Sequence, residues 1–359
     1  MITVNKTDFL NAIKSTRPCV AKMNINPIIN CIHLQTLNGA LFLTATDTTI
    51  SAKSFCEASI DEDIDICINA EKLESIVGKL DDFISIDVQD TIVEIKSGET
   101  VFKLLKIVSK DYPEVKFETE DATHINVNPK DFVKGIEKAL IATSNEENYI
   151  LNSVCLTLTK DGYELASTDG NRLCQIKCIE NNESEGQYII PQKILNILLK
   201  NVESELDIYL QKNNIIFKTS KCILKQGLFP GIYPKYQQLI PTDLPMQVVV
   251  DKNLLLQSLE KVAIMCDDRT NITTFDFQPN SLYINASCDN GSAKDCITTN
   301  GEANIKIAFN YKYILAGIKV MEASEIVFEM NTNMSACLIK GDFTYLVMPV
   351  RPQENIDKN

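Results

Sequence analysis

The segment ITVNKTDFLNAIK, residues 2–14, begins as a short stretch of alternating apolar and polar residues and continues with a different period. Val4 closes the alternating part, which is typical of a β-strand with one buried face. Phe9 and Ile13 follow four residues apart, and this spacing places side chains on one face of a helix. The segment therefore predicts a strand that leads directly into an amphipathic helix.

This strand–helix pattern occurs three times in the chain. It returns as INVNPKDFVKGIEK at residues 125–138 and as VVVDKNLLLQSLEK at residues 248–261. The equivalent residues Val4, Val127 and Val250 are 123 residues apart in both steps. A period of this length is too long for a solenoid repeat and indicates tandem domains.

A second predicted helix recurs with a step of 121 residues, which places Leu73, Ile194 and Leu315 at equivalent positions. Segments such as SIDVQDTIVEIKSG, DIYLQKNNIIFKTS and EIVFEMNTNMSACLIKG alternate apolar and polar residues and are predicted to form antiparallel hairpins. We therefore expect an α+β fold with three tandem copies of one domain, each with two helices and antiparallel sheet. The expected domains are residues 1–121, 122–244 and 245–359, the last with a short polar C-terminal tail.

The segment LASTDGNRLCQIK, residues 165–177, contains a strong turn signal. Asp169 and Gly170 between β-rich runs predict a hairpin, because both residue types tolerate positive φ. Asp47 in LTATD and, more weakly, Asp289 in NASCD occupy equivalent positions. Asp47 and Asp169 could form a catalytic carboxylate pair, but their equivalent positions favour a shared turn-capping role. The pattern alone leaves open whether the second hairpin is also a docking site.

Composition indicates a globular protein, with 45% apolar and 23% charged residues in a chain of 359. Twelve cysteines are scattered without a Cys-x-x-Cys pair, and the only histidines are His33 and His124. This spacing favours reduced, mostly buried thiols in the cytoplasm, so we expect neither a metal nor a cofactor. We also expect no secretory signal and no membrane span, because the N-terminal segment lacks a basic and apolar leader and no apolar run is long enough.

The net charge of −13 argues against nucleic acid until its distribution is considered. The predicted helices carry a net charge of +8, which leaves −21 on the rest of the chain. These helices are residues 6–17, 70–79, 129–138, 191–200, 252–261 and 311–320. Ordinary solvated helix faces would explain any one of them, but segregation across a repeated set predicts a basic track that holds phosphates without recognising sequence.

Motifs for catalysis are missing from the sequence. It contains no Gly-rich phosphate loop, no dinucleotide-binding glycine motif after a strand and no G-x-S-x-G nucleophile elbow. With two histidines and no repeated carboxylate pairing, general acid–base catalysis has little support. We therefore expect a protein that is not an enzyme and has no catalytic residues.

Four segments, in this order and spacing, are specific as a set. They are STDGNRL (167–173), YPKYQQLIP (233–241), FNYKYIL (309–315) and YLVMPVR (345–351). Together they resemble the bacterial DNA polymerase III beta subunits, the sliding-clamp family, and the similarity covers essentially the whole chain. The resemblance implies a processivity factor for DNA replication. It also implies a head-to-tail homodimer, a ring of six domains whose helices line a hole around duplex DNA.

The resemblance further implies a groove that binds short extended peptides of the replicative polymerase, the clamp loader and repair proteins. Its residues would be Leu151, Thr168, Gly170, Arg172, Leu173, Pro234, Leu239, Leu346, Met348, Pro349, Val350 and Arg351. Met348 would be an adaptable floor, and Arg172 and Arg351 a polar rim. Plain core packing remains the alternative for the leucines at 151, 239 and 346.

Two further sets of residues follow from the resemblance and the basic track. The residues expected to face DNA are Lys14, Lys22, Lys134, Lys138, Lys193, Lys200, Lys261, Lys312 and Lys319. The residues that match the dimer contacts of the family are Ile76, Leu80, Phe102, Leu104, Ile264 and Met265.

The sequence also departs from the family. Asn171 stands where the family often has His, and Lys22 is followed by Met23 and Asn24 in a loop with little positive charge. The tail PQENIDKN continues beyond Arg351, where many members stop. A different class of function stays open beside the clamp: an acidic scaffold of several domains that binds peptides but does not encircle DNA. An enzyme is a distant third.

Overall fold

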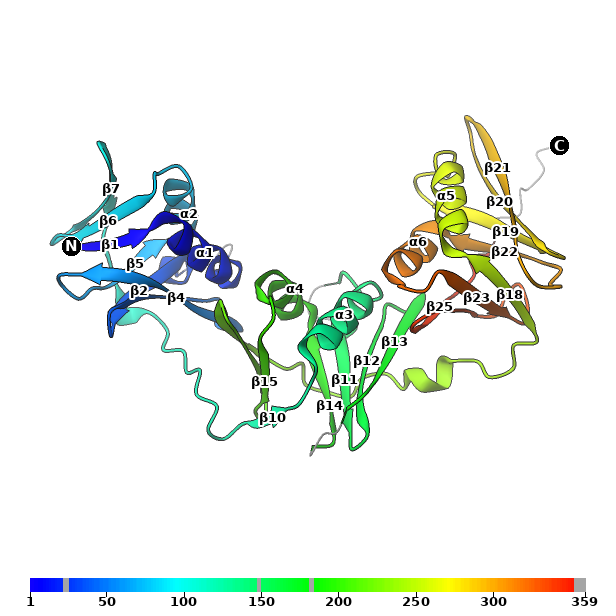
Figure 1. The fold of residues 1–359 in the computed structure, drawn as a ribbon, viewed down its shortest axis with the longest axis horizontal. Helices are drawn as coiled ribbons and strands as arrows, with labels where there is room; N and C mark the ends of the chain where they lie inside the picture. Colours follow the sequence, from blue (N-terminus) through cyan, green and yellow to red (C-terminus); the bar gives the residue numbers. More distant parts are fainter. Residues whose placement is uncertain (22–25, 147–149, 181–183, 352–359) are drawn as a thin grey trace. The chain divides into compact units, whose positions relative to one another are not determined.

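The structure is a computed structural model that describes residues 1–21, 26–146, 150–180 and 184–351. Within these ranges, α-helices occur at all six predicted places, and their ends lie within a few residues of the prediction (Figure 1). The helices are α1 (Lys6–Thr16), α2 (Ala70–Val77), α3 (Pro129–Leu140), α4 (Gln192–Asn201), α5 (Lys252–Ala263) and α6 (Tyr311–Val320). Short 3₁₀ helices span Arg17–Cys19, Pro27–Asn30, Ser109–Asp111 and Tyr236–Leu239.

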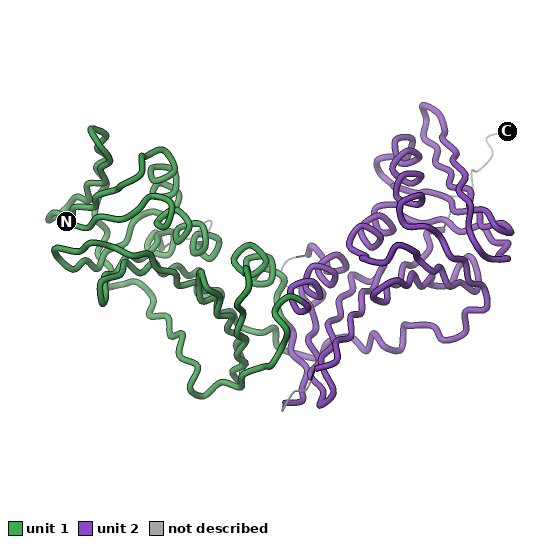
Figure 2. The backbone as a smooth tube through the Cα atoms, viewed as in Figure 1, with its two compact units in different colours: residues 1–130, 190–230 green, residues 131–189, 231–359 purple. Residues whose placement is uncertain are grey.

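The chain forms two compact units, residues 1–130 with 190–230 and residues 131–189 with 231–359 (Figure 2). In unit 1, one sheet follows the order β10-β15-β16-β17-β4-β1-β6-β7-β8, and β2, β3, β5 and β9 branch from it. The main-path strands are β10 (Thr123–Ile125), β15 (Leu206–Leu210), β16 (Asn214–Thr219), β17 (Cys222–Gly227), β4 (Ile50–Ile60), β1 (Ile2–Asn5), β6 (Phe83–Val88), β7 (Ile92–Ser97) and β8 (Thr100–Leu105). The branching strands are β2 (Cys31–Leu37), β3 (Ala40–Thr46), β5 (Asp65–Asn69) and β9 (Ile107–Val108).

Two further sheets account for the remaining strands among the described residues. The larger has the order β14-β11-β12-β13-β25-β24-β23-β18, and the smaller has the order β21-β20-β19-β22. The larger sheet contains β14 (Gly186–Pro191), β11 (Ser153–Thr159), β12 (Gly162–Thr168), β13 (Arg172–Ile179), β25 (Thr344–Val347), β24 (Cys337–Lys340), β23 (Glu325–Met330) and β18 (Met246–Asp251). The smaller contains β21 (Gly291–Thr298), β20 (Ser281–Cys288), β19 (Ile272–Gln278) and β22 (Ile305–Asn310). The three predicted hairpins are confirmed as the antiparallel pairs β6–β7, β15–β16 and β23–β24.

The strand–helix transition in the repeat has a local cause. Asn5 is the last residue of β1 and the N-cap of α1, and its side chain accepts hydrogen bonds from the N–H groups of Thr7 and Asp8. Asp251 and Asn310 cap α5 and α6 in the same way. A short polar side chain at this position satisfies N–H groups that the first helical turn cannot pair. The chain therefore turns from strand to helix within one residue.

Each helix buries the apolar face that the sequence predicted. Phe9 and Ile13 of α1 are fully buried, and α1 packs against β4 and α2. Leu255 and Leu259 do the same for α5, which packs against β20, β21 and α6. Burying an apolar side chain of this size contributes about 1.5–3 kcal/mol. Helices α1 and α5 thus bury their apolar faces against neighbouring strands and helices.

The cysteines are free, and nine of the twelve are buried, as the sequence predicted. Burial raises the pKa of the Cys31, Cys155 and Cys222 thiols to about 11, so these thiols stay protonated. Among the described residues, no helix has the length and apolar character needed to cross a membrane.

Candidate functional site

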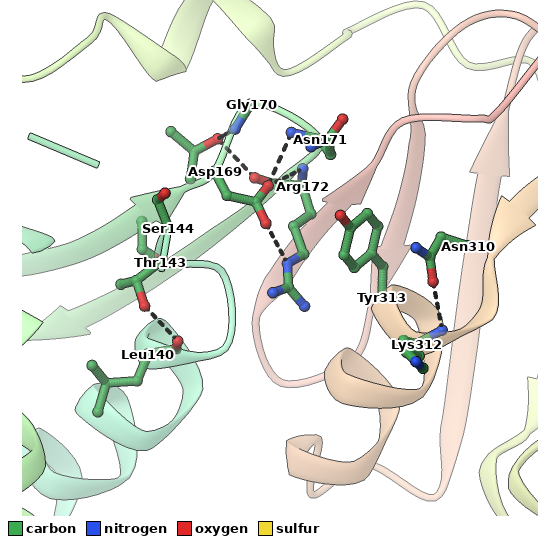
Figure 3. A network of polar contacts seen from close by, with 12 residues as sticks. Leu140, Thr143, Ser144, Asp169, Gly170, Asn171, Arg172, Asn310, Lys312 and Tyr313 are labelled. Carbon is green, nitrogen blue, oxygen red and sulfur yellow. Dashed lines mark hydrogen bonds and ion pairs between the residues drawn. The ribbon is translucent and has the colours of Figure 1, made fainter. Parts of the chain in front are cut away.

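The turn between β12 and β13 is built around Asp169. Its Oδ1 accepts hydrogen bonds from the N–H groups of Asn171 (2.9 Å) and Arg172 (3.1 Å). Thr168 Oγ1 donates to the carbonyl of Arg172 (2.7 Å) and accepts from the N–H of Gly170 (3.2 Å). Gly170 has φ of 90°, a conformation that favours glycine. The predicted hairpin is confirmed, and so is the capping role of Asp169 (Figure 3).

Arg172 leaves this turn toward helix α6. Its Nε donates to Asp169 Oδ2 at 2.9 Å, and its guanidinium lies 4.5 Å from the centre of the Tyr313 ring (Figure 3). The carbonyl of Tyr313 accepts a hydrogen bond from the Tyr345 hydroxyl at 2.9 Å. Only 15% of the Arg172 side chain is exposed, so its guanidinium is held between Asp169 and Tyr313 and is not a freely exposed polar group. The sequence interpretation missed Tyr313, although the segment FNYKYIL contained it.

Strand β25 joins the hairpin to the third repeat. Leu173 pairs with Leu346, and the N–H of Met348 donates to the carbonyl of Asn171 at 2.8 Å. Leu173 and Leu346 are 1% and 4% exposed, so both pack in the core. Met348 is 39% exposed, which leaves its flexible thioether available to a ligand.

The linker after residue 230 is fixed beneath the same hairpin. The Tyr233 hydroxyl accepts a hydrogen bond from the N–H of Thr168 at 3.2 Å, and the Tyr236 hydroxyl donates to Glu164. Both tyrosines are almost fully buried, at 2% and 1% exposure. Leu239, in the short helix that follows, is 58% exposed. The hairpin, strand β25 and the linker tyrosines are therefore bonded together within unit 2.

The twelve predicted groove residues divide into two kinds. Core packing, the alternative left open for three leucines, applies to Leu346, whereas Leu239 is exposed and Leu151 is partly buried. Thr168 is also buried. The residues with surface to offer are Leu151, Gly170, Pro234, Leu239, Met348, Pro349, Val350 and Arg351. Fewer residues are therefore accessible than the sequence predicted. Leu239 and Met348 are the exposed large apolar side chains among them.

The turn after β3 repeats this design in unit 1. Asp47 Oδ1 accepts from the N–H groups of Thr49 and Ile50, each at 2.9 Å, and Oδ2 pairs with Lys193 at 2.5 Å. Burial alone would raise the Asp47 pKa, but Lys193 and the two N–H groups outweigh it and hold the pKa below its usual value. The predicted capping role of Asp47 is thus confirmed. The weaker echo, Asp289, lies in the tight turn between β20 and β21.

Most of the lysines predicted to face DNA have acidic partners of their own. The ion pairs are Lys134–Glu322 (3.1 Å), Lys138–Asp342 (2.5 Å), Lys193–Asp47 (2.5 Å), Lys261–Asp295 (3.4 Å) and Lys319–Glu260 (3.1 Å). Lys14, Lys200 and Lys312 are exposed and make no ion pair within the described residues. Lys22 lies outside the described residues, as do Met23, Asn24 and the tail after Arg351.

The residues predicted for the dimer contact lie in contrasting environments. Ile76 and Leu80 are 8% and 2% exposed in unit 1 and have little surface to give to a second chain. Phe102 and Leu104 are partly exposed on β8, as is Met265 after α5. Ile264 is 80% exposed. In the described ranges, no cluster of side chains has the composition of a metal site.

Comparison with known proteins agrees with this architecture along the whole chain. Profiles of the DNA polymerase III beta subunit match as the N-terminal domain at residues 1–116, the central domain at 126–235 and the C-terminal domain at 237–351. The chain belongs to the DNA polymerase III beta subunit family. The predicted fold of three tandem clamp domains is thereby confirmed, as is the role of a DNA sliding clamp in replication.

Relatives and solved structures cover nearly the full chain. The beta sliding clamp of Synechococcus elongatus is 27% identical over 87% of this chain and 88% of its own, and that of Chlamydia pneumoniae is 24% identical over 97% and 98%. The crystal structure of the Bacillus subtilis DNA polymerase sliding clamp has a TM-score of 0.89 at 25% identity and covers 98% of this chain and 99% of its own. A Pseudomonas aeruginosa sliding clamp, solved bound to griselimycin, has a TM-score of 0.90 at 22% identity, with 98% and 100% covered.

Proposed function

We propose that two copies of this chain close head to tail into a ring around duplex DNA, in the cytoplasm, and tether their partners through a groove beside Met348. The partners would be the replicative polymerase, the clamp loader and repair proteins, which insert short peptides with Leu or Phe anchors. Each chain would contribute the domains 1–121, 122–244 and 245–359. The observation that carries this proposal is an exposed Met348 whose backbone is bonded to an Asp169-capped hairpin, to which Tyr233 of the linker is also bonded. An apolar anchor in such a groove is the usual basis of peptide recognition.

Two strand edges support ring closure. Strand β8 ends the sheet path in unit 1, and β21 ends the four-stranded sheet in unit 2. Val101 and Leu105 on β8 are 45% and 79% exposed, and Ile264 near β21 is 80% exposed. Unpaired strand edges with exposed apolar side chains on or beside them favour pairing with another chain. Because the two edges differ, a contact between them is heterologous, and two such contacts close a ring of two copies.

The acidic turns support a role without catalysis. Asp47 and Asp169 each use one carboxylate oxygen for backbone N–H groups and the other for a cation. Neither oxygen is left to move a proton to or from a substrate. The free, mostly buried thiols support a reducing compartment.

Ring closure can be tested with Ile264→Asp. The change places a charge in the proposed contact, where an unpaired carboxylate costs several kcal/mol, and leaves the fold intact because Ile264 is exposed. Size-exclusion chromatography with light scattering should show a dimer for the wild type and a monomer for the variant. Ile179→Asp is the matched control, because Ile179 is 97% exposed and lies outside the contact. A monomeric wild type, or an unchanged dimer in Ile264→Asp, contradicts the ring.

A further inference from the structure

Two lysines of helix α3 form ion pairs with the same carboxylate, that of Glu322. Lys134 and Lys138 are one helical turn apart, and their Nζ atoms lie 3.1 Å and 3.3 Å from the two separate oxygens of Glu322. Glu322 follows α6 in the third repeat, so its partners lie more than 180 residues earlier in the chain, within the same compact unit. Each ammonium group contacts a separate oxygen of one carboxylate. A phosphate group could bind to the two lysines in the same way.

A second ion pair fixes the inner lysine. Lys138 Nζ lies 2.5 Å from Asp342 Oδ2, and Asp342 Oδ1 accepts a hydrogen bond from the N–H of Glu322 at 2.8 Å. Lys138 also lies over the Phe343 ring, 5.9 Å from its centre. Burial alone would lower the Lys138 pKa, but Asp342 and Glu322 outweigh it and raise the pKa. Asp342 is the larger of the two contributions, so Lys138 keeps an ion-pair partner when Glu322 leaves.

The outer pair is far more accessible than the inner pair. The side chains of Lys134 and Glu322 are 53% and 54% exposed, whereas those of Lys138 and Asp342 are 13% and 27% exposed. An exposed ion pair on long side chains contributes little stability and exchanges readily. Glu322 can therefore swing into solvent while the Lys138–Asp342 pair remains.

We propose that Lys134 and Lys138 form a phosphate-binding site that Glu322 occupies in the free protein. The ligand is a backbone phosphodiester of duplex DNA, which displaces the Glu322 carboxylate and takes up its contacts with the two ammonium groups. Asp342 positions Lys138 and does not leave. This inference rests on the proposed ring around DNA and adds a competitor built into the DNA-facing surface. Such a competitor weakens the hold on DNA and favours sliding.

Glu322→Gln tests the competition directly. Binding of a labelled duplex to the full-length protein, followed by fluorescence anisotropy at low salt, should tighten by about two- to fivefold, the factor that an exposed ion pair contributes. The slope of affinity against salt should change by less than about one unit, because the phosphodiester makes the same contacts with the two lysines in both proteins. Adding Lys134→Met should abolish the gain. Asp161→Asn is the matched control: it removes one negative charge from an exposed aspartate without an ion pair in the described part of the chain.

The outcomes separate this inference from the proposed function. If Glu322→Gln binds duplex no more tightly than Asp161→Asn, the masked site is refuted. Charge reversal at Lys200 and Lys312, which lack ion pairs within the described ranges, should weaken duplex binding in either case. If it does not, the DNA-facing surface itself is wrong. Inorganic phosphate at matched ionic strength should not compete with the duplex in Glu322→Gln, and full competition would show a site for free phosphate instead.

Discussion

Strands β4 and β17 pair in unit 1 in the same register as β13 and β25 pair in unit 2. In both places, the residue after the last pair donates its N–H to a carbonyl of the preceding turn. Gly227 donates to Thr49 over 3.3 Å, and Met348 donates to Asn171 over 2.8 Å. The two sites are therefore equivalent junctions between consecutive repeats, and their backbones follow one design.

The side chains of the two junctions differ at each equivalent position. Ser51, Lys225 and Gly227 at the first junction correspond to Leu173, Leu346 and Met348 at the second. The first junction thus lacks the apolar pair formed by Leu173 and Leu346 and has no side chain at the position of Met348, although Ile50 beside it is fully buried. An Asp-capped hairpin alone does not make a docking site, because the apolar residues that surround it decide whether a peptide anchor can bind.

The turns themselves also differ in detail. Thr48 has φ of 78° where Gly170 has φ of 90°, so a β-branched residue tolerates the turn of the first junction. Asp47 pairs with Lys193 of α4, whereas Asp169 pairs with Arg172, which lies on Tyr313 of α6. The first turn is thereby tied to Lys193 of α4, and the second, through Arg172, to Tyr313 of α6.

The largest expected effect is that of Leu173→Ala on stability. Leu173 is 1% exposed, so its truncation should cost about 2–5 kcal/mol of unfolding free energy. Ser51→Ala, the equivalent change at the first junction, should cost about 0.5–1.5 kcal/mol, since it removes only a hydrogen bond with Thr46. Urea denaturation of both variants measures the difference. Equal losses would show that the two junctions do not differ in core packing.

Met348→Ala should affect binding rather than folding. Its exposed thioether is the proposed anchor for a peptide, so the affinity for a polymerase-tail peptide should fall by about 1–3 kcal/mol. Gly227→Ala is the matched change at the first junction, where an added Cβ lies 3.9 Å from the nearest atom, the Asn213 oxygen. Fluorescence titration should show no change for this variant. An equal loss of affinity in both variants would assign docking to both junctions.

Exchange of the turn residues should have a smaller effect. Gly170→Thr forces a β-branched residue to φ of 90° and should cost about 1–2 kcal/mol. No atom lies within 4 Å of the added Cβ, so this cost is conformational rather than steric. Thr48→Gly should change stability by less than about 1 kcal/mol, because relief of strain offsets the greater freedom of the unfolded chain. Thermal melts of the two variants measure both changes in stability. Equal losses in Gly170→Thr and Thr48→Gly would contradict the expected difference between the turns.

The smallest expected effect concerns pH. The Asp47 pKa lies below its usual 3.8, so its contribution to stability is present above that pH and is lost as the pH falls further, through the folded-state pKa. Asp47→Asn should therefore flatten the fall in stability below pH 3.8, with an effect of about 1 kcal/mol. Lys193→Met should flatten it too, since it removes the cation that holds the pKa down. If acid unfolding is unchanged in both variants, the ion pair between Asp47 and Lys193 does not contribute to the stability of this turn.

The sequence predicted those parts of the fold that depend on local pattern. Helical spacing such as that of Phe9 and Ile13 located all six helices, and alternation located the hairpins. The equivalent positions of Asp47 and Asp169 predicted a shared capping role, because a turn is stabilised by its own neighbouring N–H groups. The period of 123 residues identified the repeat without knowledge of any fold.

Long-range pairing was beyond local pattern. Leu173 and Met348 are both apolar in sequence, yet one is core and the other is exposed: Leu173 lies inside the sheet between β12 and β25, whereas Met348 follows the end of β25. The partners of Lys134 and Lys138 were also invisible, since Glu322 and Asp342 lie in another repeat. Net charge per helix therefore predicted a basic surface but not how much of it is neutralised.

The stoichiometry of peptide binding tests the central claim most directly. Isothermal titration calorimetry with the C-terminal peptide of the replicative polymerase from the same organism should show one site per chain, because only the second junction has an exposed apolar side chain at the position of Met348, where the first has Gly227. Met348→Gly, which gives the second junction the residue of the first, should abolish binding while light scattering still shows a dimer. Two sites per chain, or undiminished binding in Met348→Gly, would contradict the account.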